Sequence, residues 1–378
     1  MAALHVAQVN FLPAPDDRTP TEVLDQWPTL VDVAEAVAGA GIRVSVIQAA
    51  TRAAHVLRHG IAYHFTGSGD TGATVGWGRR VAELLAGIEA DVVHVNGLAF
   101  AADAFALAQC LPRLPIVLQD HADRPPRQWR RARWRRWLAV AAGAAFTAPE
   151  LALPFTSAGL LQPSTRLFAI AESTSRFVPG SRARARAQTG LHGDPCVLWV
   201  GHLSPGKDPL TVLDGVARAV SQLPGLQLWC AYGSAPLLAE VHRRIAGDPR
   251  LTGRVHLLGN IAHAHVEALM RAADLFVSGS LAESCGYAVL EAIACGLAPV
   301  VTDIPAFRAL TGHGRVGKLW PRGDPAQLAE ALVRTALGGR SVERVRAHFD
   351  AALSSAAIGR QWAQAYALVH DDRLRRAR

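Results

Sequence analysis

Two carboxylates in the second half of the chain have the setting of a ligand-binding pair. Glu283 is followed by Ser-Cys-Gly-Tyr-Ala-Val-Leu and then by Glu291, in a segment that is otherwise apolar. The run Leu275–Ser278 predicts a strand before the pair, and Gly286 marks the start of a helix. The N–H groups and the dipole at that helix start favour a phosphate group. A charge on a buried helix needs a partner, so we expect Glu291 to accept hydrogen bonds from ribose hydroxyl groups, with Glu283 in the preceding loop.

Lys207 is the second residue that could do chemistry. It ends the loop Gly-His-Leu-Ser-Pro-Gly-Lys, between a predicted strand at Cys196–Val200 and a predicted helix at Pro209–Val220. Lys207 and Lys318 are the only lysines in the chain. A fixed ammonium group at a helix start could stabilise the negative charge that a departing diphosphate acquires. The alternative is an exposed loop lysine, just as the two glutamates could be solvated helix residues.

The first half of the chain alternates short apolar strands with helices. A helix between the first two strands begins with Thr19 as N-cap, Pro20 at its first position and Glu22 closing a capping box, and it ends at Gly39. This alternation is typical of a doubly wound α/β domain. The predicted strands are Leu4–Val9, Arg43–Gln48, Asp91–Val95 and Pro115–Leu118.

The same alternation starts again after a segment rich in Arg, Gly, Pro and Ser, from about Phe177 to Pro195, which we interpret as the linker and the entry to the second domain. We therefore expect an α/β protein with two Rossmann-like domains facing across a cleft, where ligands of such sheets bind. The expected divisions are residues 1–178, residues 190–345, and a helical tail at 346–378 that could pack back on the first domain. The predicted strands of the second domain are Cys196–Val200, Leu226–Ala231, Val255–Leu258, Leu275–Ser278 and Pro299–Thr302, and its helices Pro209–Val220, Pro236–Ile245, His263–Ala272 and Tyr287–Ala294.

The lysine loop and the glutamate segment together resemble the corresponding segments of the family 4 glycosyltransferases, which have the two-domain GT-B fold. The resemblance covers most of the second domain, from Cys196 to Leu332, and is weaker over the first. It implies that a sugar moves from a nucleoside diphosphate donor to an acceptor, with retention at the anomeric carbon and without a metal ion. The chain has no Asp-x-Asp motif in a suitable setting. Four further segments support the resemblance and occur in the same order as in the family. They are residues 257–261, 272–280, 299–308 and 316–324.

The resemblance also implies a role for each residue of the donor site. Lys207 would contact the donor diphosphate, Glu283 the donor sugar and Glu291 the ribose. The backbone at Gly286 and Tyr287 would meet the phosphates. The base and the sugar of the donor stay open.

Three further features bear on the rest of the site. His202 stands where the family usually has arginine, which makes its contact with the phosphates weaker or dependent on pH. His121 resembles the family's active-site histidine, which lies near the donor sugar; a surface loop histidine is the alternative. His94 we interpret as a packed strand residue. The loop Asn10–Pro15 replaces the Gly-Gly loop that usually follows the first strand, and it leaves the acceptor unidentified.

The net charge of +8 and the sequence pI of about 9.8 favour anionic partners. The densest basic and aromatic stretch is Arg127–Trp137, in which we expect Trp129, Trp134 and Trp137 to share one side of a helix. This stretch could lie on an anionic membrane surface, bind nucleic acid, or be a solvated helix with its tryptophans packed inward. No nucleic-acid module surrounds it, so we expect no nucleic-acid partner. A peripheral contact with a membrane through residues 127–138 stays open.

Cysteine usage and the absence of targeting signals suggest a compartment. Five widely spaced cysteines without a Cys-x-x-Cys pair indicate free thiols in a reducing compartment and no zinc site. No secretory signal precedes the first strand, and no apolar stretch is long enough to span a membrane. We therefore expect a cytoplasmic protein, in contact with the inner face of the membrane if residues 127–138 bind it. Residues 67–72 match Gly-x-Gly-x-x-Gly but follow a later segment than the first strand, and we interpret them as a flexible loop.

Three functions stay open at this point. The first is glycosyl transfer. The second is epimerisation of a nucleotide sugar on the same fold, which would need extra acid and base groups. The third is binding of a nucleotide sugar without catalysis, which the histidine at position 202 keeps open.

Overall fold

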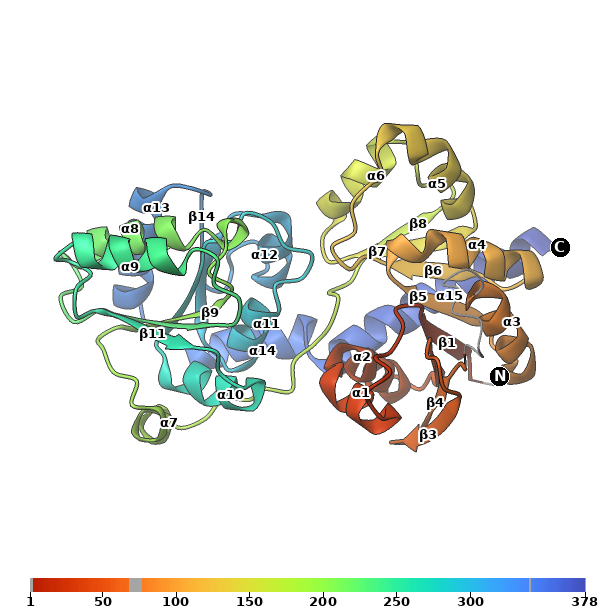
Figure 1. The fold of residues 1–378 in the computed structure, drawn as a ribbon, viewed down its shortest axis with the longest axis horizontal. Coiled ribbons are helices and arrows are strands. Elements are labelled where there is room, and N and C mark those ends of the chain that lie inside the picture. The colour runs from red at the N-terminus through yellow and green to blue at the C-terminus, as the bar shows by residue number, and fades with distance from the viewer. Residues whose placement is uncertain (1–2, 68–76, 340, 378) are drawn as a thin grey trace. The chain divides into compact units, whose positions relative to one another are not determined.

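The computed structural model describes residues 3–67, 77–339 and 341–377, which form two compact units (Figure 1). The first unit consists of the residues up to Thr174 together with those from Ser355 onward, and the second of Ser175–Ser354. The first division, after Thr174, lies four residues before the expected one at 178, and the second, at Ser355, lies nine residues after the expected one at 346. The glycine loop predicted at residues 67–72 falls, from position 68 on, outside the described residues.

The first unit is built on an eight-stranded sheet with the strand order β3-β4-β2-β1-β5-β6-β7-β8. Neighbouring strands run parallel except β3 and β4, which form an antiparallel hairpin. Nearly all side chains of β1, β2 and β5 are buried, as expected for parallel strands with helices on both faces. The strands are β1 (His5–Asn10), β2 (Arg43–Gln48), β3 (Ala54–Arg58), β4 (Ile61–Phe65), β5 (Val92–Asn96), β6 (Ile116–Gln119), β7 (Ala141–Phe146) and β8 (Arg166–Ala169).

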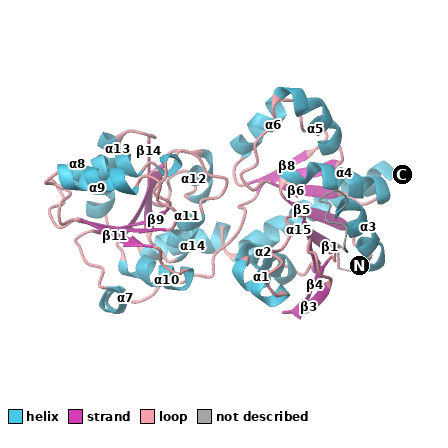
Figure 2. Ribbon diagram, in the orientation of Figure 1, coloured by secondary structure: helices cyan, strands magenta, loops and turns pink. Residues whose placement is uncertain are grey.

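Helices cover both faces of this sheet (Figures 1 and 2). α2 packs between α1 and α15 on one face, and α4 packs between α3 and α5 on the other. The helices are α1 (Pro20–Gln26), α2 (Pro28–Gly39), α3 (Trp77–Ile88), α4 (Ala101–Cys110), α5 (Arg131–Leu138), α6 (Leu153–Ser157) and α15 (Ser355–Ala377), with short 3₁₀ turns at Leu98–Phe100, Gln128–Arg130 and Pro149–Ala152.

The second unit has a six-stranded sheet with the order β11-β10-β9-β12-β13-β14, in which all neighbours run parallel. α8 packs against α9 and α13 on one face, and α11 packs against α10 and α14 on the other (Figure 2). The strands are β9 (Cys196–Gly201), β10 (Gln227–Tyr232), β11 (Val255–Gly259), β12 (Leu275–Ser278), β13 (Ala298–Thr302) and β14 (Lys318–Trp320). The helices are α7 (Arg182–Thr189), α8 (Pro209–Ala219), α9 (Leu238–Gly247), α10 (His263–Ala272), α11 (Tyr287–Ala294), α12 (Pro305–Leu310), α13 (Pro325–Leu337) and α14 (Val342–Ala352), with a 3₁₀ turn at Pro205–Lys207.

The single helix expected after Thr19 is two helices. Its start is confirmed, because Thr19 and Glu22 form both hydrogen bonds of a capping box. The helix ends at Gln26, and a second one begins at Pro28. Pro28 has no N–H to donate and restricts the residue before it, so Trp27 leaves the helical region with φ −111° and ψ 66°.

The segment predicted as the linker and the entry to the second domain contains a helix that the sequence did not predict, at Arg182–Thr189, and this helix belongs to the second unit. The side chain of Ser181 caps α7 by accepting a hydrogen bond from the N–H of Arg184 at 3.3 Å. Arg186 on α7 then donates to the buried Asp274 at 2.7 Å, directly before β12. The helix is therefore fixed to the second unit by a charge pair that composition alone did not reveal.

His94 is a packed strand residue, as predicted. It is fully buried on β5, and burial lowers its pKa to about 3, so the ring is neutral. Tyr366 on α15 lies 2.7 Å from Nδ1, and Trp362 packs on the ring with centroids 4.2 Å apart. This contact anchors the last helix of the chain to the central strands of the first unit.

The three tryptophans of the basic stretch do not share one side, contrary to expectation. Trp134 and Trp137 on α5 pack against the hydrophobic core of the first unit, whereas Trp129 lies in the preceding 3₁₀ turn and is 71% exposed. Arg130 stacks on its ring, 4.5 Å from the centroid. The change from a 3₁₀ turn to an α-helix at Arg131 alters the angle per residue, which separates the first tryptophan from the other two.

Candidate functional site

The second unit brings Lys207 and Glu283 together in an ion pair between Nζ and Oε1. Their side chains are 29% and 16% exposed, so the pair is mostly shielded from solvent but remains open to a ligand. Lys207 follows β9 and Glu283 follows β12, and these two strands are neighbours in the sheet. Carboxyl ends of adjacent parallel strands meet at the same edge, which explains how two distant segments supply one site.

The two loops that carry this pair are joined through their backbones. The N–H of Leu281 donates to the carbonyl of Gly206 at 2.9 Å. Gly279 allows this approach, because a Cβ atom there would lie 2.9 Å from the carbonyl oxygen of Asp208 and 3.1 Å from that of Lys207. Asp208 itself adopts a left-handed conformation with φ 46°, and its side chain caps α8 at the N–H of Thr211, 3.3 Å away. The ammonium group therefore projects from a rigid turn.

The start of α11 lies in the second of these loops. Its N-cap is Gly286, which has φ 87° and makes no side-chain cap to the helix. A Cβ atom at this position would lie 2.5 Å from the ring of Phe307, so both conformation and space require glycine. The first helical residue, Tyr287, is exposed. The positive end of the helix dipole thus comes just after Glu283 in the chain, as predicted for a phosphate site.

Glu291 lies inside α11 and is half-buried. Its Oε1 atom is 2.6 Å from Nε2 of His263, the first residue of α10. The ring of Phe177 stacks on that histidine, with centroids 5.3 Å apart. His263 was not predicted as a site residue, because nothing in its own segment indicates that Glu291 lies beside the start of α10. The predicted need of Glu291 for a partner is met here by a protein side chain.

His202, at the end of β9, is held by the loop after β10. Its Nδ1 atom accepts a hydrogen bond from the N–H of Ser234 at 3.1 Å. In the neutral ring the hydrogen is therefore on Nε2, which becomes a donor. The side chain is exposed. This geometry gives His202 a hydrogen-bond donor suited to an anionic oxygen, whether or not the ring is charged.

The first unit places His121 in a cluster of carboxylates after β6. Nδ1 of His121 lies 2.7 Å from Oε1 of Glu172, which follows β8 and is buried. Burial of the ring opposes a charge on it, but the hydrogen bond to Glu172 and the carboxylates around the ring outweigh that effect and raise the pKa of His121. Burial also raises the pKa of Asp120 to about 7. His121 is therefore partly buried beside a carboxylate group, and it is not an isolated surface residue.

Comparison with known protein families gives two matches, one in each unit. Residues 194–336 match the profile of "Glycosyl transferases group 1", and residues 28–149 match that of "Glycosyltransferase Family 4". The chain belongs to the family 4 glycosyltransferases. Of the predicted site residues in this glycosyltransferase, the first range contains Lys207, Glu283 and Glu291, and the second contains His121.

Curated relatives agree with the family. The D-inositol 3-phosphate glycosyltransferases of Mycobacterium tuberculosis and Mycobacterium bovis are each 35% identical to this glycosyltransferase over 187 residues. The aligned part is 47% of this chain and 38% of each relative. The chain thus matches well under half the length of these relatives.

Solved structures confirm the predicted GT-B fold. Sucrose-phosphate synthase from Thermosynechococcus elongatus superposes with a TM-score of 0.67 at 21% identity, over 98% of this chain and 100% of that one. HepE from Anabaena in complex with UDP and glucose superposes with a TM-score of 0.66 at 19% identity, over 96% and 99% of the two chains. At these identities the likeness shows the architecture, which is an α/β fold of two Rossmann-like units.

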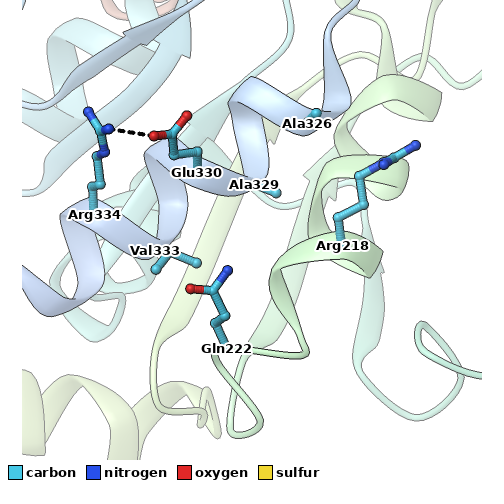
Figure 3. A pocket seen from close by; sticks show the side chains of 7 residues that line it. All are labelled: Arg218, Gln222, Ala326, Ala329, Glu330, Val333 and Arg334. Carbon is cyan, nitrogen blue, oxygen red and sulfur yellow. Dashed lines mark ion pairs between the residues drawn. The ribbon is translucent and has the colours of Figure 1, made fainter.

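Figure 3 shows a groove on the surface of the second unit. It runs between α8 and α13, and Arg334 on its rim pairs with Glu330 at 2.5 Å. Arg218 lies near the end of α8, whereas Lys207 precedes the start of that helix, which is about 16 Å long. The groove is therefore not part of the donor site. Its lining residues are Arg218, Gln222, Ala326, Ala329, Glu330, Val333 and Arg334.

Three further findings concern the described part of the chain. No group of three or more His, Cys, Asp or Glu side chains there is arranged to hold a metal ion. None of the helices in residues 3–67, 77–339 and 341–377 combines the length and apolar character required to cross a bilayer. All five cysteines are free thiols, as expected.

Proposed function

We propose that this chain is an enzyme that transfers a hexosyl group from a nucleoside diphosphate sugar to an acceptor hydroxyl group, with retention of the anomeric configuration and without a metal ion. In this reaction the bond between the anomeric carbon and the diphosphate oxygen breaks. A new bond forms between that carbon and the acceptor oxygen, and the acceptor's proton leaves with the diphosphate. The observation that carries the proposal is the ion pair of Lys207 with Glu283 beside the start of α11.

The residues of the second unit divide the work of donor binding and leaving-group departure. The ammonium group of Lys207 stabilises the charge that grows on the diphosphate as it departs. The N–H groups at the start of α11, at Gly286 and Tyr287, bind the phosphate oxygens. Glu291 accepts hydrogen bonds from the ribose, and Glu283 holds Lys207 in place and faces the sugar. His202 donates from Nε2 to a phosphate oxygen, where an arginine would donate twice.

In the first unit, His121 contacts the sugar.

The two relatives' names and the HepE titles suggest where to begin the search for substrates. HepE has been solved with UDP-glucose, and the mycobacterial relatives are named for D-inositol 3-phosphate. We therefore propose a uridine diphosphate sugar as the first donor to test and a phosphorylated polyol as the first acceptor.

Released nucleoside diphosphate tests the proposal directly. Purified protein is incubated with UDP-, GDP- and ADP-sugars, with and without D-inositol 3-phosphate, and with and without EDTA. Transfer that continues in EDTA and gives a product with the donor's anomeric configuration, as seen by proton NMR, supports every part of the proposal. A new nucleotide sugar would indicate an epimerase, and thermal stabilisation without product would indicate binding alone. Loss of activity in EDTA would contradict the metal-free reaction.

We also propose that residues 127–138 contact an anionic membrane surface on the cytoplasmic side. The exposed ring of Trp129 supports this, because tryptophan favours the membrane interface. Arg127, Arg130 and Arg133 are exposed around it and supply positive charge. Leu153 on α6 is a further exposed apolar side chain of the first unit. Such a contact would place the enzyme beside lipid-linked or membrane-bound acceptors without a spanning helix.

A further inference from the structure

Glu172 is a buried carboxylate whose partner in the first unit is a predicted active-site residue. Its side chain is 6% exposed, and its Oε1 atom lies 2.7 Å from Nδ1 of His121. A carboxylate accepts hydrogen bonds and cannot donate them, so Nδ1 of the histidine carries a hydrogen. Glu172 lies outside both sequence ranges that match the family profiles.

The other ring nitrogen of His121 is unsatisfied. Nε2 is shielded from solvent and has no hydrogen-bond partner among the described residues. A buried polar atom without a partner costs about 1–3 kcal/mol. A ligand oxygen at Nε2 would remove that cost, so the ring is prepared to contact something that the folded chain alone does not supply.

A directed hydrogen-bond chain fixes the backbone of Glu172. Because His94 is neutral, its Nδ1 atom can accept a hydrogen bond from the hydroxyl group of Tyr366 at 2.7 Å. The Nε2 atom of His94 then donates to Oε1 of Gln119 at 3.1 Å. The amide nitrogen of Gln119 donates in turn to the carbonyl of Glu172 at 3.0 Å. Each member of the chain is buried and has its donor matched to an acceptor. The carboxylate that faces His121 is thus built on a rigid support.

The loop of His121 is equally constrained. Asp123 accepts hydrogen bonds from the N–H groups of Leu98 at 2.7 Å, Ala99 at 3.0 Å and His121 at 3.3 Å. Asp120 accepts from the N–H of Asp123 at 3.0 Å. The charged or titratable groups that influence the ring are Glu172 after β8, Asp120 and Asp123 after β6, and His94 on β5.

We propose that Glu172 is the positioning residue for His121: it accepts a hydrogen bond from Nδ1–H, favours the charged ring, and so presents Nε2–H as a donor to an oxygen of the sugar substrate. This inference rests on the proposed function, because it needs a substrate that reaches His121. The carboxylates around the ring raise the pKa of His121, in agreement with a ring that keeps both hydrogens. The active form is the protonated one, so kcat falls as the pH rises through the pKa of His121.

Glu172→Gln tests this proposal, because glutamine keeps the shape and an acceptor oxygen but removes the charge. Two measurements are made against pH. NMR follows the titration of the His121 ring in the ligand-free protein, with the signal assigned by means of His121→Asn. Steady-state kinetics give kcat and KM for release of UDP from UDP-glucose. We expect the NMR pKa and the alkaline limb of kcat to move down together by about one pH unit or more, while KM changes little. Glu83→Gln, an exposed carboxylate on α3, is the matched control and should change neither.

Glu172→Asp gives a second measurement that does not depend on the first variant folding. It keeps the charge but shortens the side chain, so we expect a wild-type alkaline limb with a lower kcat. A kcat limb that stays in place while the NMR pKa falls, or an NMR pKa that does not respond to loss of the charge, overturns the positioning role. If the wild-type protein does not release UDP from any donor, the proposed function itself fails. If the wild type releases UDP and the alkaline limb of kcat does not move in Glu172→Gln, only the role of Glu172 is wrong.

Discussion

Lys207 and Glu283, 76 positions apart in the chain, form an ion pair at the ends of two neighbouring strands. In the ligand-free protein the carboxylate thus holds the ammonium group in the place where a diphosphate would need it. Such preorganisation matters because a fixed charge requires no rearrangement as the leaving group departs. The pair is partly exposed, so its contribution to folding is small.

Lys207→Met should reduce kcat about 100- to 1000-fold, because the charge that meets the departing diphosphate is lost. The free energy of unfolding should change by less than about 1 kcal/mol, as is usual for a partly exposed ion pair. Steady-state release of nucleoside diphosphate and urea unfolding measure the two effects. Lys318→Met, at the exposed lysine of β14, is the matched control. Equal loss of activity in both variants would show that net charge, and not the position of Lys207, is what matters.

Glu291→Ala should weaken the binding of UDP about 10- to 100-fold, since a hydrogen bond to a charged group contributes about 1.5–3 kcal/mol. Calorimetric titration of UDP measures the dissociation constant, and kcat at saturating donor should fall much less. Glu330→Ala, at an exposed helix residue paired with Arg334, is the control. An unchanged dissociation constant in Glu291→Ala would mean that this carboxylate serves only its contact with His263.

Buried elements were the most predictable from sequence. The strands Arg43–Gln48 and Leu275–Ser278 and the helices His263–Ala272 and Tyr287–Ala294 have the predicted bounds. Apolar runs indicate the strands, and apolar residues at helical spacing indicate the helices. The β3–β4 hairpin was missed. Its alternate residues are exposed, and its two-residue turn, His59-Gly60, has φ 51° and 79°, a pattern that the alternation and the glycine could have revealed.

For the candidate site, the sequence indicated individual residues but not the contacts between them. Loops after strands indicated Lys207 and Glu283, yet only the strand order, with β9 beside β12, brings them together. His263 and Glu172 were not predicted, because each matters through a partner far away in sequence. Sequence patterns report the local environment of a residue, whereas these contacts depend on the packing of complete sheets and helices.

The buried Asp120 predicts a stability change with pH. Its pKa in the folded protein, about 7, lies above the usual value of 3.8, so the folded state keeps the proton longer. The associated stability is complete below about pH 4 and is lost between about pH 4 and 7, at up to ~1.4 kcal/mol per pH unit. Asp120→Asn removes this dependence because an amide does not titrate, and its oxygen can still accept the N–H of Asp123.

His94 contributes with the opposite sign. Its folded pKa, about 3, lies below the usual 6.5, so its contribution is present above about pH 6.5 and is lost as the pH falls. In the wild type the two effects offset one another, and Asp120→Asn should therefore become more stable with rising pH between 4 and 6.5, more steeply than the wild type. Urea unfolding across this range checks the slope, with Asp371→Asn at an exposed position as control. Parallel curves for wild type and Asp120→Asn would contradict the raised pKa.

Binding to anionic vesicles should depend on the basic stretch and not on the net charge. Replacing Arg127, Arg130 and Arg133 by glutamine should weaken binding to phosphatidylglycerol-containing vesicles about 100-fold, at about 1 kcal/mol for each arginine near the surface. Co-sedimentation measures this. The control changes the same number of exposed arginines elsewhere, namely Arg218, Arg243 and Arg360.

Trp129→Ala separates insertion from simple attraction. Loss of the exposed ring should weaken binding by a factor that changes little with salt, because the interfacial preference of tryptophan does not depend on charge, whereas the arginine effect should shrink as salt screens it. Trp134 and Trp137 are unsuitable for this test, since both pack on the core and their removal would destabilise the first unit. If the two triple variants lost affinity equally, or if Trp129→Ala bound like the wild type at every salt concentration, the surface contact through residues 127–138 would be wrong.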